Sequence, residues 1–175
     1  MRQELYWIDG PWPAKLAVAP RPRGEDWLED EMAGWKNAGV GTILSLLTAE
    51  EERELGLSRE SQEARRHDMR FLSLPIPDRQ VPFSETELSA VLEKLDGDLA
   101  RGENVVVHCR QGIGRSALVS ACLLISKGFT PDSALQKVGA ARGMHVPETR
   151  EQREWIEHYA AITAAPKSPS SRSPR

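Results

Sequence analysis

One short segment of the chain combines residue types that can bind and attack a phosphate group. Residues 105–124 read VVVHCRQGIGRSALVSACLL, in which a run of valines leads to a cysteine and apolar sequence resumes after an arginine. The pattern predicts a buried strand, a short loop with Gly112 and Gly114, and a helix that begins near Gly114. Amides of a glycine-containing loop at a helix N-terminus can turn inward and bind an anion. The segment therefore predicts a phosphate site with Cys109 at its floor.

The side chains of this loop suggest a reaction as well as a binding site. The helix dipole, the inward amides and Arg115 all favour the thiolate form of Cys109, which is the nucleophilic form. The planar guanidinium of Arg115 can hold two phosphate oxygens at once. The hydroxyl of Ser116 can hydrogen-bond the sulfur and ease its departure from a covalent intermediate. We expect His108 to bond nearby backbone and support the loop rather than to act as a base.

The segment HCRQGIGRS resembles the signature of the protein tyrosine phosphatase superfamily, in which five residues separate a cysteine from an arginine followed by serine. It is most similar to the dual-specificity and related small phosphatases. The resemblance implies that Cys109 attacks phosphorus to form a cysteinyl-phosphate, with no metal and no cofactor. It also implies that the phosphate, or a similar anion such as vanadate, is bound by the loop residues Arg110, Gln111, Gly112, Ile113, Gly114 and Arg115.

The resemblance further directs attention to an aspartate in an upstream loop that would protonate the leaving group. The segment PIPDRQVP places Asp78 in such a loop, 31 residues before Cys109. The alternative is an ordinary Pro-Asp turn with a structural role only. As general acid, Asp78 must be protonated while Cys109 is ionised, which predicts a bell-shaped pH profile with an optimum at about pH 5–6.5.

Three further residues have two interpretations each. Gln152 resembles a glutamine that some superfamily members use to position the hydrolytic water, but it also completes a capping box with Thr149 at a helix start. Arg142 either lines the pocket as a second basic group or is a solvated loop arginine. Cys122 either packs in the core, which we expect, or forms a disulfide with Cys109.

The rest of the sequence predicts the elements that must position this site. Strand patterns alternate with helical patterns, which indicates a single α/β domain with a largely parallel central sheet of four or five strands flanked by helices. The resemblance implies the phosphatase-type fold. The predicted strands are 5–8, 15–19, 41–47, 69–76 and 104–109, and the principal predicted helices are 26–38, 84–101, 114–126, one beginning at 130–131, and 149–163.

Two polar segments between these elements, 48–55 and 58–68, are predicted to be helical. The acidic run AEEERE in the first of them suggests a solvated helix face. We expect the catalytic domain to span residues 1–163. Residues 164–175, rich in proline, serine and basic residues, have the composition of a disordered tail.

Composition restricts the class of protein and its location. The 175 residues are 39% hydrophobic and 28% charged, with a net charge of −3, which is ordinary for one globular domain. This charge gives no reason to expect binding to nucleic acid or to a membrane. Two cysteines form neither a disulfide framework nor, by themselves, a zinc site. With no apolar run at the N-terminus, the sequence favours a cytoplasmic location and leaves the oligomeric state open.

The substrate is the least determined feature. The superfamily includes enzymes for phosphotyrosine, phosphoserine and phosphothreonine, phosphoinositides and RNA 5′-triphosphates. Arg110 is the only basic residue inside the loop, which disfavours a highly anionic lipid headgroup and favours a phosphoprotein, with phosphotyrosine first. Two other classes stay open, a rhodanese-type sulfurtransferase and a phosphate-binding module without catalysis.

Overall fold

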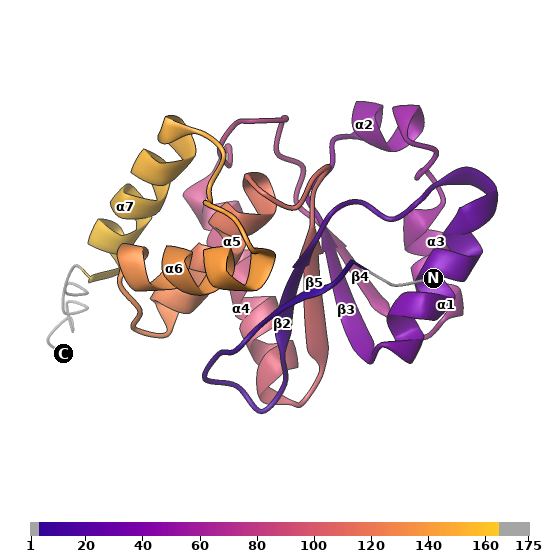
Figure 1. Cartoon of the computed structure of the whole chain (residues 1–175), viewed down its shortest axis with the longest axis horizontal. Helices are drawn as coiled ribbons and strands as arrows, with labels where there is room; N and C mark the ends of the chain where they lie inside the picture. The colour runs from indigo at the N-terminus through magenta and orange to yellow at the C-terminus, as the bar shows by residue number, and fades with distance from the viewer. Residues whose placement is uncertain (1–3, 165–175) are drawn as a thin grey trace, which may run out of the picture.

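The computed structural model describes residues 4–164, which form a five-stranded sheet between two layers of helices (Figure 1). The strand order is β1-β2-β5-β3-β4, and all neighbouring strands are parallel except β1 and β2. The strands are β1 (Tyr6–Ile8), β2 (Leu16–Ala19), β3 (Val40–Ser45), β4 (Arg70–Ser73) and β5 (Asn104–His108). The predicted single-domain α/β architecture with a largely parallel sheet is confirmed.

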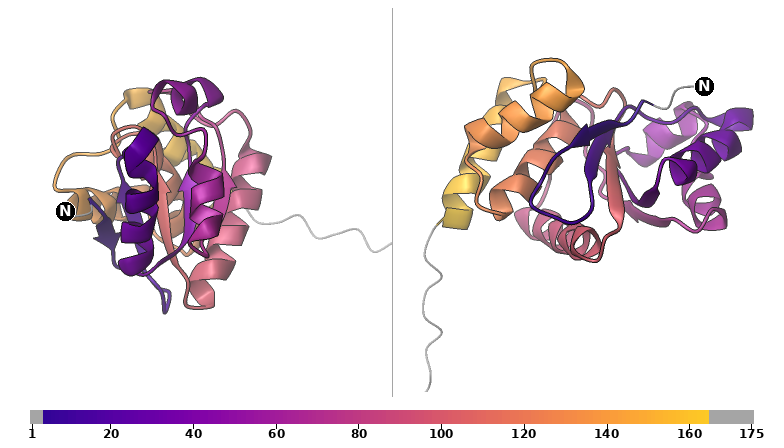
Figure 2. Two further views of the ribbon diagram at one scale, coloured as in Figure 1. Left: turned by 90° about the vertical axis from the view of Figure 1, so that its right-hand side faces the viewer. Right: turned by 60° about the horizontal axis from the view of Figure 1, so that its bottom comes forward.

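Helices cover both faces of the sheet, as the two turned views in Figure 2 make clear. The apolar core on one face includes residues of α4, α5, α6 and α7, whereas the core on the other includes residues of α1 and α3. The helices are α1 (Leu28–Asn37), α2 (Ala49–Glu54), α3 (Glu60–Arg66), α4 (Glu85–Ala100), α5 (Arg115–Ser126), α6 (Pro131–Arg142) and α7 (Arg150–Ala164), with a 3-10 turn η1 (Glu25–Trp27) before α1.

The valine run forms the centre of the sheet. β5 lies between β2 and β3, and the side chains of Val105, Val106 and Val107 are fully buried. Val105 and Val107 belong to one apolar cluster and Val106 to the other, because successive side chains of a strand point to opposite faces. A strand covered on both faces needs an unbroken apolar run, which explains the sequence.

The register of the strands brings distant loops together at one edge of the sheet. His108 at the end of β5 is aligned with Ala19 at the end of β2 and with Ser45 at the end of β3. Ser45 is in turn aligned with Ser73 at the end of β4. The segments that follow these four strands therefore gather at the carboxyl edge, where ligands bind in open α/β sheets.

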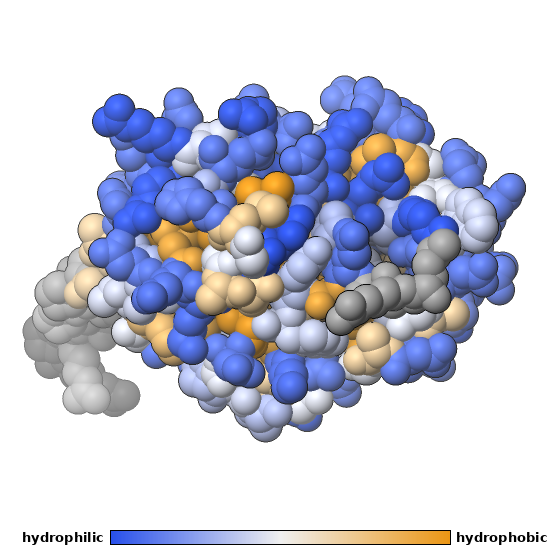
Figure 3. All heavy atoms as spheres, viewed as in Figure 1, coloured by the Kyte–Doolittle hydropathy of each residue, from blue (hydrophilic) through white to orange (hydrophobic). Residues whose placement is uncertain are grey.

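The described part of the chain ends with α7, and its surface is mainly hydrophilic in the view of Figure 3. The predicted helix 149–163 is α7, which includes Ala164; the rest of the predicted tail lies outside the described residues. The face seen in Figure 3 is mainly hydrophilic, with hydrophobic side chains in smaller patches. Within residues 4–164 no helix is both long enough and apolar enough to cross a membrane.

Candidate active site

The loop between β5 and α5 holds Cys109 at the floor of the predicted anion site. Cys109 directly follows β5, and its side chain is almost fully buried. The backbone N–H of Gly112 donates to Cys109 Sγ at 3.3 Å, and the Ser116 hydroxyl oxygen lies 3.4 Å from the sulfur. Two groups that can donate to a thiolate therefore lie beside the sulfur, and the role of Cys109 as nucleophile stays a prediction.

Both glycines of the loop are required by close contacts. Gly112 has a φ of +71°, and a Cβ there would lie 2.7 Å from the carbonyl carbon of Ala19 at the end of β2. A Cβ on Gly114 would lie 2.9 Å from Gln152 Oε1. A side chain at Gly112 would push the loop away from β2, whereas one at Gly114 would displace the side chains of Gln152 and Glu148.

Arg115, the first residue of α5, is the most densely bonded side chain of the site and is 1% exposed. Nη1 donates to Glu51 Oε2 and to the Ile76 carbonyl, both at 2.8 Å. Nη2 donates to Glu51 Oε1 at 2.9 Å and to Asp78 Oδ1 at 3.0 Å. Burial by itself would lower the pKa of Arg115, but the hydrogen bonds from Arg115 to Glu51 and the nearby negative charges raise it.

These bonds use all four N–H groups of Nη1 and Nη2, while Nε has no partner among the described residues. The sequence suggests that Arg115 can hold two phosphate oxygens. In this structure only Nε is available, so a second bond from the side chain requires Nη1 or Nη2 to give up a partner.

Glu51 corrects the prediction that the AEEERE run is a solvated helix face. Its neighbour Glu50 is exposed, but Glu51 is buried and forms a paired interaction with Arg115. Thr48 caps α2 and shares a capping box with Glu51. Burial by itself would raise the pKa of Glu51, but hydrogen bonds from Arg115 and Thr48 outweigh it and leave the pKa below its ordinary value. The sequence carried a signal for this position, since the spacing Thr48-x-x-Glu51 marks a helix start.

Asp78 lies in the loop after β4 and accepts a hydrogen bond from Arg115 Nη2 at 3.0 Å, and its role as general acid stays a prediction. Its side chain is half exposed, unlike that of Glu51. The next residue, Arg79, has a φ of +62° and pairs with Glu148 at 2.8 Å. The loop is therefore tied to the segment before α7, while the Asp78 carboxylate itself faces the open side of the site.

His108 supports the loop, but through a partner that the sequence did not suggest. Its ring is fully buried and lies edge-on to Trp35. Nε2 lies 2.7 Å from Glu60 Oε1 on α3, whereas the expected backbone contact, from Nδ1 to the Cys109 carbonyl, is 3.5 Å long. Glu60 belongs to a segment predicted only as a polar helix, so its burial is a property of the tertiary structure.

Gln152 is fully buried and forms the capping interaction that the sequence suggests. Its Oε1 accepts from the backbone N–H groups of Glu148 and Thr149, and its own N–H donates to Thr149 Oγ1. Its Nε2 donates to the carbonyl of Gln80, in the loop that carries Asp78. The amide therefore links two loops of the site, and its role toward water stays a prediction.

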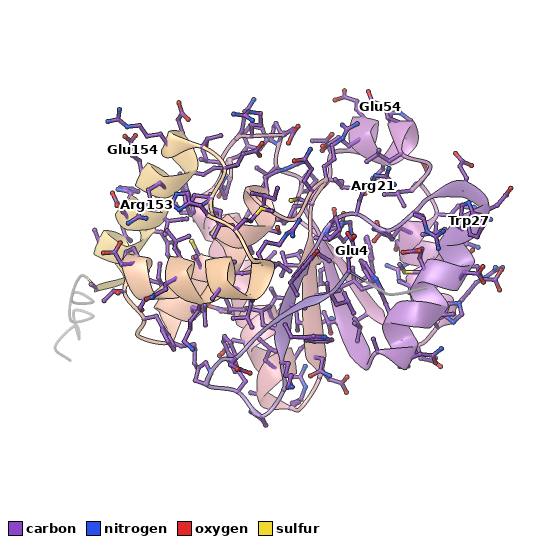
Figure 4. All side chains as sticks on the ribbon, in the orientation of Figure 1. Glu4, Arg21, Trp27, Glu54, Arg153 and Glu154 are labelled. Atoms are coloured by element: carbon purple, nitrogen blue, oxygen red, sulfur yellow. The ribbon has the colours of Figure 1, made fainter. Side chains whose placement is uncertain are left out.

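The other residues that the sequence analysis singled out lie in different surroundings. Arg142 is half-buried and its guanidinium donates to carbonyls of the phosphate loop, a contact that neither interpretation from the sequence included. Arg110 lies 3.8 Å from Glu54 of α2, which is labelled in Figure 4; Gln111 is exposed and Ile113 half-buried. Cys122 is buried in the core, and both cysteines are free, so the disulfide alternative is wrong for this structure.

Two curated relatives match about half of this chain. Cyclin-dependent kinase inhibitor 3 of Sus scrofa is 31% identical over 93 residues, which cover 52% of this chain and 43% of the relative. Putative tyrosine phosphatase 067L of Invertebrate iridescent virus 3 is 36% identical over 92 residues, 49% of this chain and 38% of the relative. The matched part is thus less than half the length of each of these relatives.

Solved structures match over nearly the whole chain. A crystal structure of kinase associated phosphatase has a TM-score of 0.86 and 19% identity and covers 95% of this chain and 99% of its own; it shows the fold. Tk-PTP in its active form has a TM-score of 0.73 and 26% identity over 92% of this chain and 99% of its own. The family model PTP-SAK, described as "Swiss Army Knife protein, DSP-PTPase phosphatase domain", matches residues 3–165. The predicted resemblance is confirmed, and the chain belongs to this family of phosphatase domains.

Proposed function

We propose that this chain is a cysteine-dependent phosphatase that hydrolyses phosphomonoesters on proteins, with phosphotyrosine as its preferred substrate. The observation that carries the proposal is the convergence of three groups. Cys109 lies at the floor of an amide-lined loop, Arg115 begins the helix above it, and Asp78 contacts that arginine at 3.0 Å. A nucleophile, a charge clamp and an acid are the parts that phosphoryl transfer through a cysteine requires.

The first step forms the cysteinyl-phosphate. The Cys109 thiolate attacks phosphorus, the bond from phosphorus to the leaving oxygen breaks, and Asp78 donates its proton to that oxygen. Inward amides of the loop, of which the Gly112 N–H is one, stabilise the negative charge on the equatorial oxygens together with Arg115.

Substrate binding also prepares Asp78 for this role. A two-point grip on the phosphate needs a second N–H of Arg115 besides Nε, and the buried bonds to Glu51 and Ile76 occupy three of the others. The half-exposed Asp78 is the partner that leaves most readily. We infer that the phosphate displaces Asp78 from Nη2, which frees the carboxyl group to take up a proton beside the leaving oxygen.

The second step returns the enzyme to its starting form. Water attacks phosphorus, Asp78 accepts a proton from it, and the bond between sulfur and phosphorus breaks. The Ser116 hydroxyl, 3.4 Å from the sulfur, donates to the departing thiolate. Gln152 is assigned to holding the Asp78 loop through Gln80, and a role in positioning the water remains the alternative.

The depth of the site favours phosphotyrosine. Cys109 is 3% exposed and Arg115 1% exposed, so the phosphate must reach well below the surface. A phenyl phosphate extends farther from a peptide backbone than the phosphate of serine or threonine. The viral relative, named a putative tyrosine phosphatase, supports the same choice.

The deciding experiment is hydrolysis of para-nitrophenyl phosphate by the purified chain. We expect turnover that vanadate inhibits and EDTA does not, and that Cys109→Ser abolishes. Cys122→Ala is the matched control, because it removes the other thiol, which lies in the core away from the loop. Thiosulfate-to-cyanide sulfur transfer without phosphatase activity would instead identify a rhodanese-type enzyme, and phosphate binding without turnover would identify a binding module.

A substrate panel then tests the preference. Tyrosine-, serine- and threonine-phosphorylated peptides of one sequence are compared with soluble phosphoinositides by phosphate release. We expect the highest kcat/KM on the phosphotyrosine peptide. A higher value on a phosphoinositide would assign the site to lipid headgroups.

We also propose a cytoplasmic location, because both thiols are free.

A further inference from the structure

Arg142 is the one arginine outside the phosphate loop that bonds two backbone carbonyls of that loop within the described residues. It is the last residue of α6, and its half-buried guanidinium donates from Nε to the Gly112 carbonyl and from Nη2 to the Gln111 carbonyl, both at 3.2 Å. Among residues 4–164 no carboxylate lies within 4.0 Å of its nitrogen atoms. Its charge is therefore directed at the outer side of the phosphate loop.

Because the peptide unit is planar, the bonds from Arg142 to the loop carbonyls also orient the loop N–H groups on the opposite side. In a trans peptide the carbonyl of one residue and the N–H of the next point in opposite directions. Holding the carbonyls of Gln111 and Gly112 outward turns the N–H groups of Gly112 and Ile113 toward the opposite side. The Gly112 N–H does donate to Cys109 Sγ at 3.3 Å, so this opposite side is the site of the anion.

Without such a restraint the loop has a low-cost alternative. Glycine adopts positive and negative φ about equally, so rotation of the Gln111–Gly112 peptide requires no side-chain rearrangement at position 112. That rotation would turn the Gly112 amide away from the sulfur. The two bonds from Arg142 oppose it, since both carbonyls would lose a charged donor.

Tyr6 holds Arg142 in turn. The guanidinium carbon lies 4.2 Å from the centre of the Tyr6 ring, a cation–π geometry. Tyr6 lies on β1, which packs against α6 near the N-terminus of the described chain (Figure 1). The ring therefore lies against the guanidinium that donates to the two loop carbonyls.

We propose that Arg142 is a positioning residue that keeps the phosphate loop in its anion-binding conformation and that stacking on Tyr6 fixes its orientation. The proposal rests on the proposed phosphatase function and adds a determinant of it outside the loop. This role of Arg142 differs from a general effect of positive charge, because it depends on a planar guanidinium with two directed N–H groups.

The test measures vanadate affinity and steady-state kinetics with para-nitrophenyl phosphate for Arg142→Met, Arg142→Lys, Tyr6→Phe and Tyr6→Leu. We expect Arg142→Met to weaken vanadate binding about tenfold or more, because two hydrogen bonds from a charged donor are lost. Arg142→Lys retains the charge but places its donors on a single nitrogen, which cannot hold both carbonyls in one plane, so it should recover only part of the loss. Tyr6→Phe keeps the ring and should match the wild type, whereas Tyr6→Leu should weaken binding about threefold.

Two further measurements separate positioning from charge and from folding. Arg150→Met is the matched charge control, because Arg150 is exposed at the start of α7 and its side chain bonds only Glu154 among residues 4–164. Raising the salt concentration should erase the small effect of Arg150→Met and leave the Arg142→Met effect largely intact. Alkylation of Cys109 by iodoacetate at one fixed pH should be slower in Arg142→Met, and thermal unfolding shows whether each variant is folded.

The outcomes distinguish this inference from the proposed function. If the wild type turns over substrate and binds vanadate, but Arg142→Met binds vanadate within twofold of it, Arg142 does not position the loop. Equal losses for Arg142→Met and Arg150→Met would reduce the effect to bulk charge and overturn the proposal. If Arg142→Met does not fold, full activity of both Arg142→Lys and Tyr6→Leu would overturn it equally. A wild type that neither binds nor hydrolyses would contradict the proposed function itself.

Discussion

The phosphate loop and the carboxylates around it are assembled in opposite ways. The loop is one continuous stretch, 108–116, in which backbone amides and a few side chains meet because a strand turns directly into a helix. The carboxylates come from three separate segments. Glu51 and Asp78 lie 64 and 37 positions from Arg115, and Glu60 lies 48 positions from His108. The groups that contact the phosphate are thus local in sequence, whereas the proposed acid Asp78 and the carboxylates that orient Arg115 and His108 are not.

The same contrast separates the energetic roles of the two regions. Loop groups act on the bound anion, so their loss should affect catalysis more than folding. Glu51 compensates a buried arginine, and removing one partner of a buried pair leaves an uncompensated charge. Substitutions in the two regions should therefore differ in the ratio of lost activity to lost stability.

Among the substitutions that compare the two regions, we expect the largest effect at Arg115, which belongs to the loop and bonds the carboxylates. Arg115→Lys should lower kcat/KM by about a hundred- to a thousandfold, because lysine cannot hold the phosphate and Glu51 in one plane. Stopped assays with para-nitrophenyl phosphate measure this loss. Arg66→Lys on the exposed side of α3 is the control. Activity within threefold of the wild type for Arg115→Lys would mean that a planar guanidinium is not needed.

The next largest effect, that of Glu51→Gln, should be greater on folding than on catalysis. Glu51→Gln should destabilise the fold by about 3 kcal/mol, because the charge of Arg115 stays buried without its partner. It should also lower kcat/KM about tenfold, since a misplaced guanidinium loses a phosphate contact. Urea unfolding and kinetics are compared with Glu50→Gln, the exposed neighbour on α2. Equal stability of the two variants would show that the pair contributes nothing to folding.

The pH dependence of stability should identify the same carboxylate. The pKa of Glu51 is lowered in the folded state because hydrogen bonds from Arg115 and Thr48 outweigh burial. A lowered pKa stabilises the fold above the ordinary value of 4.5, and this stabilisation is lost as the pH falls through the folded-state pKa. The difference in unfolding free energy between wild type and Glu51→Gln should therefore shrink from pH 6 toward about pH 3. A difference that stays constant over this range would contradict the assignment.

The smallest expected effect concerns Gln152. Gln152→Ala should cost about 1 kcal/mol of stability through loss of the helix cap, and Thr149→Val should cost a similar amount. Only Gln152→Ala also releases Gln80, so it alone should lower kcat/KM a few-fold. The pre-steady-state burst should keep its wild-type amplitude. A larger burst followed by slow hydrolysis would instead identify Gln152 as the residue that positions water.

Most of the elements and half of the site could be predicted from the sequence. The valine run had to be a central strand because an unbroken apolar stretch is stable only when both faces are covered. The loop that follows is predicted to bind an anion, because its glycines and the helix start leave amides without partners. The acidic residues were harder to predict, because a glutamate on a polar helix has the same local pattern whether it faces solvent or a buried arginine.

The sequence alone predicted the loop after the valine run, its candidate nucleophile Cys109 and the succession of strands and helices along the chain, since each depends on interactions between residues close together in the chain. Only the tertiary structure decided that Glu51 holds Arg115, that Glu60 faces His108, and that Arg142 and Tyr6 support the loop from outside. These contacts depend on strand register and helix packing, which bring together side chains that no local pattern connects.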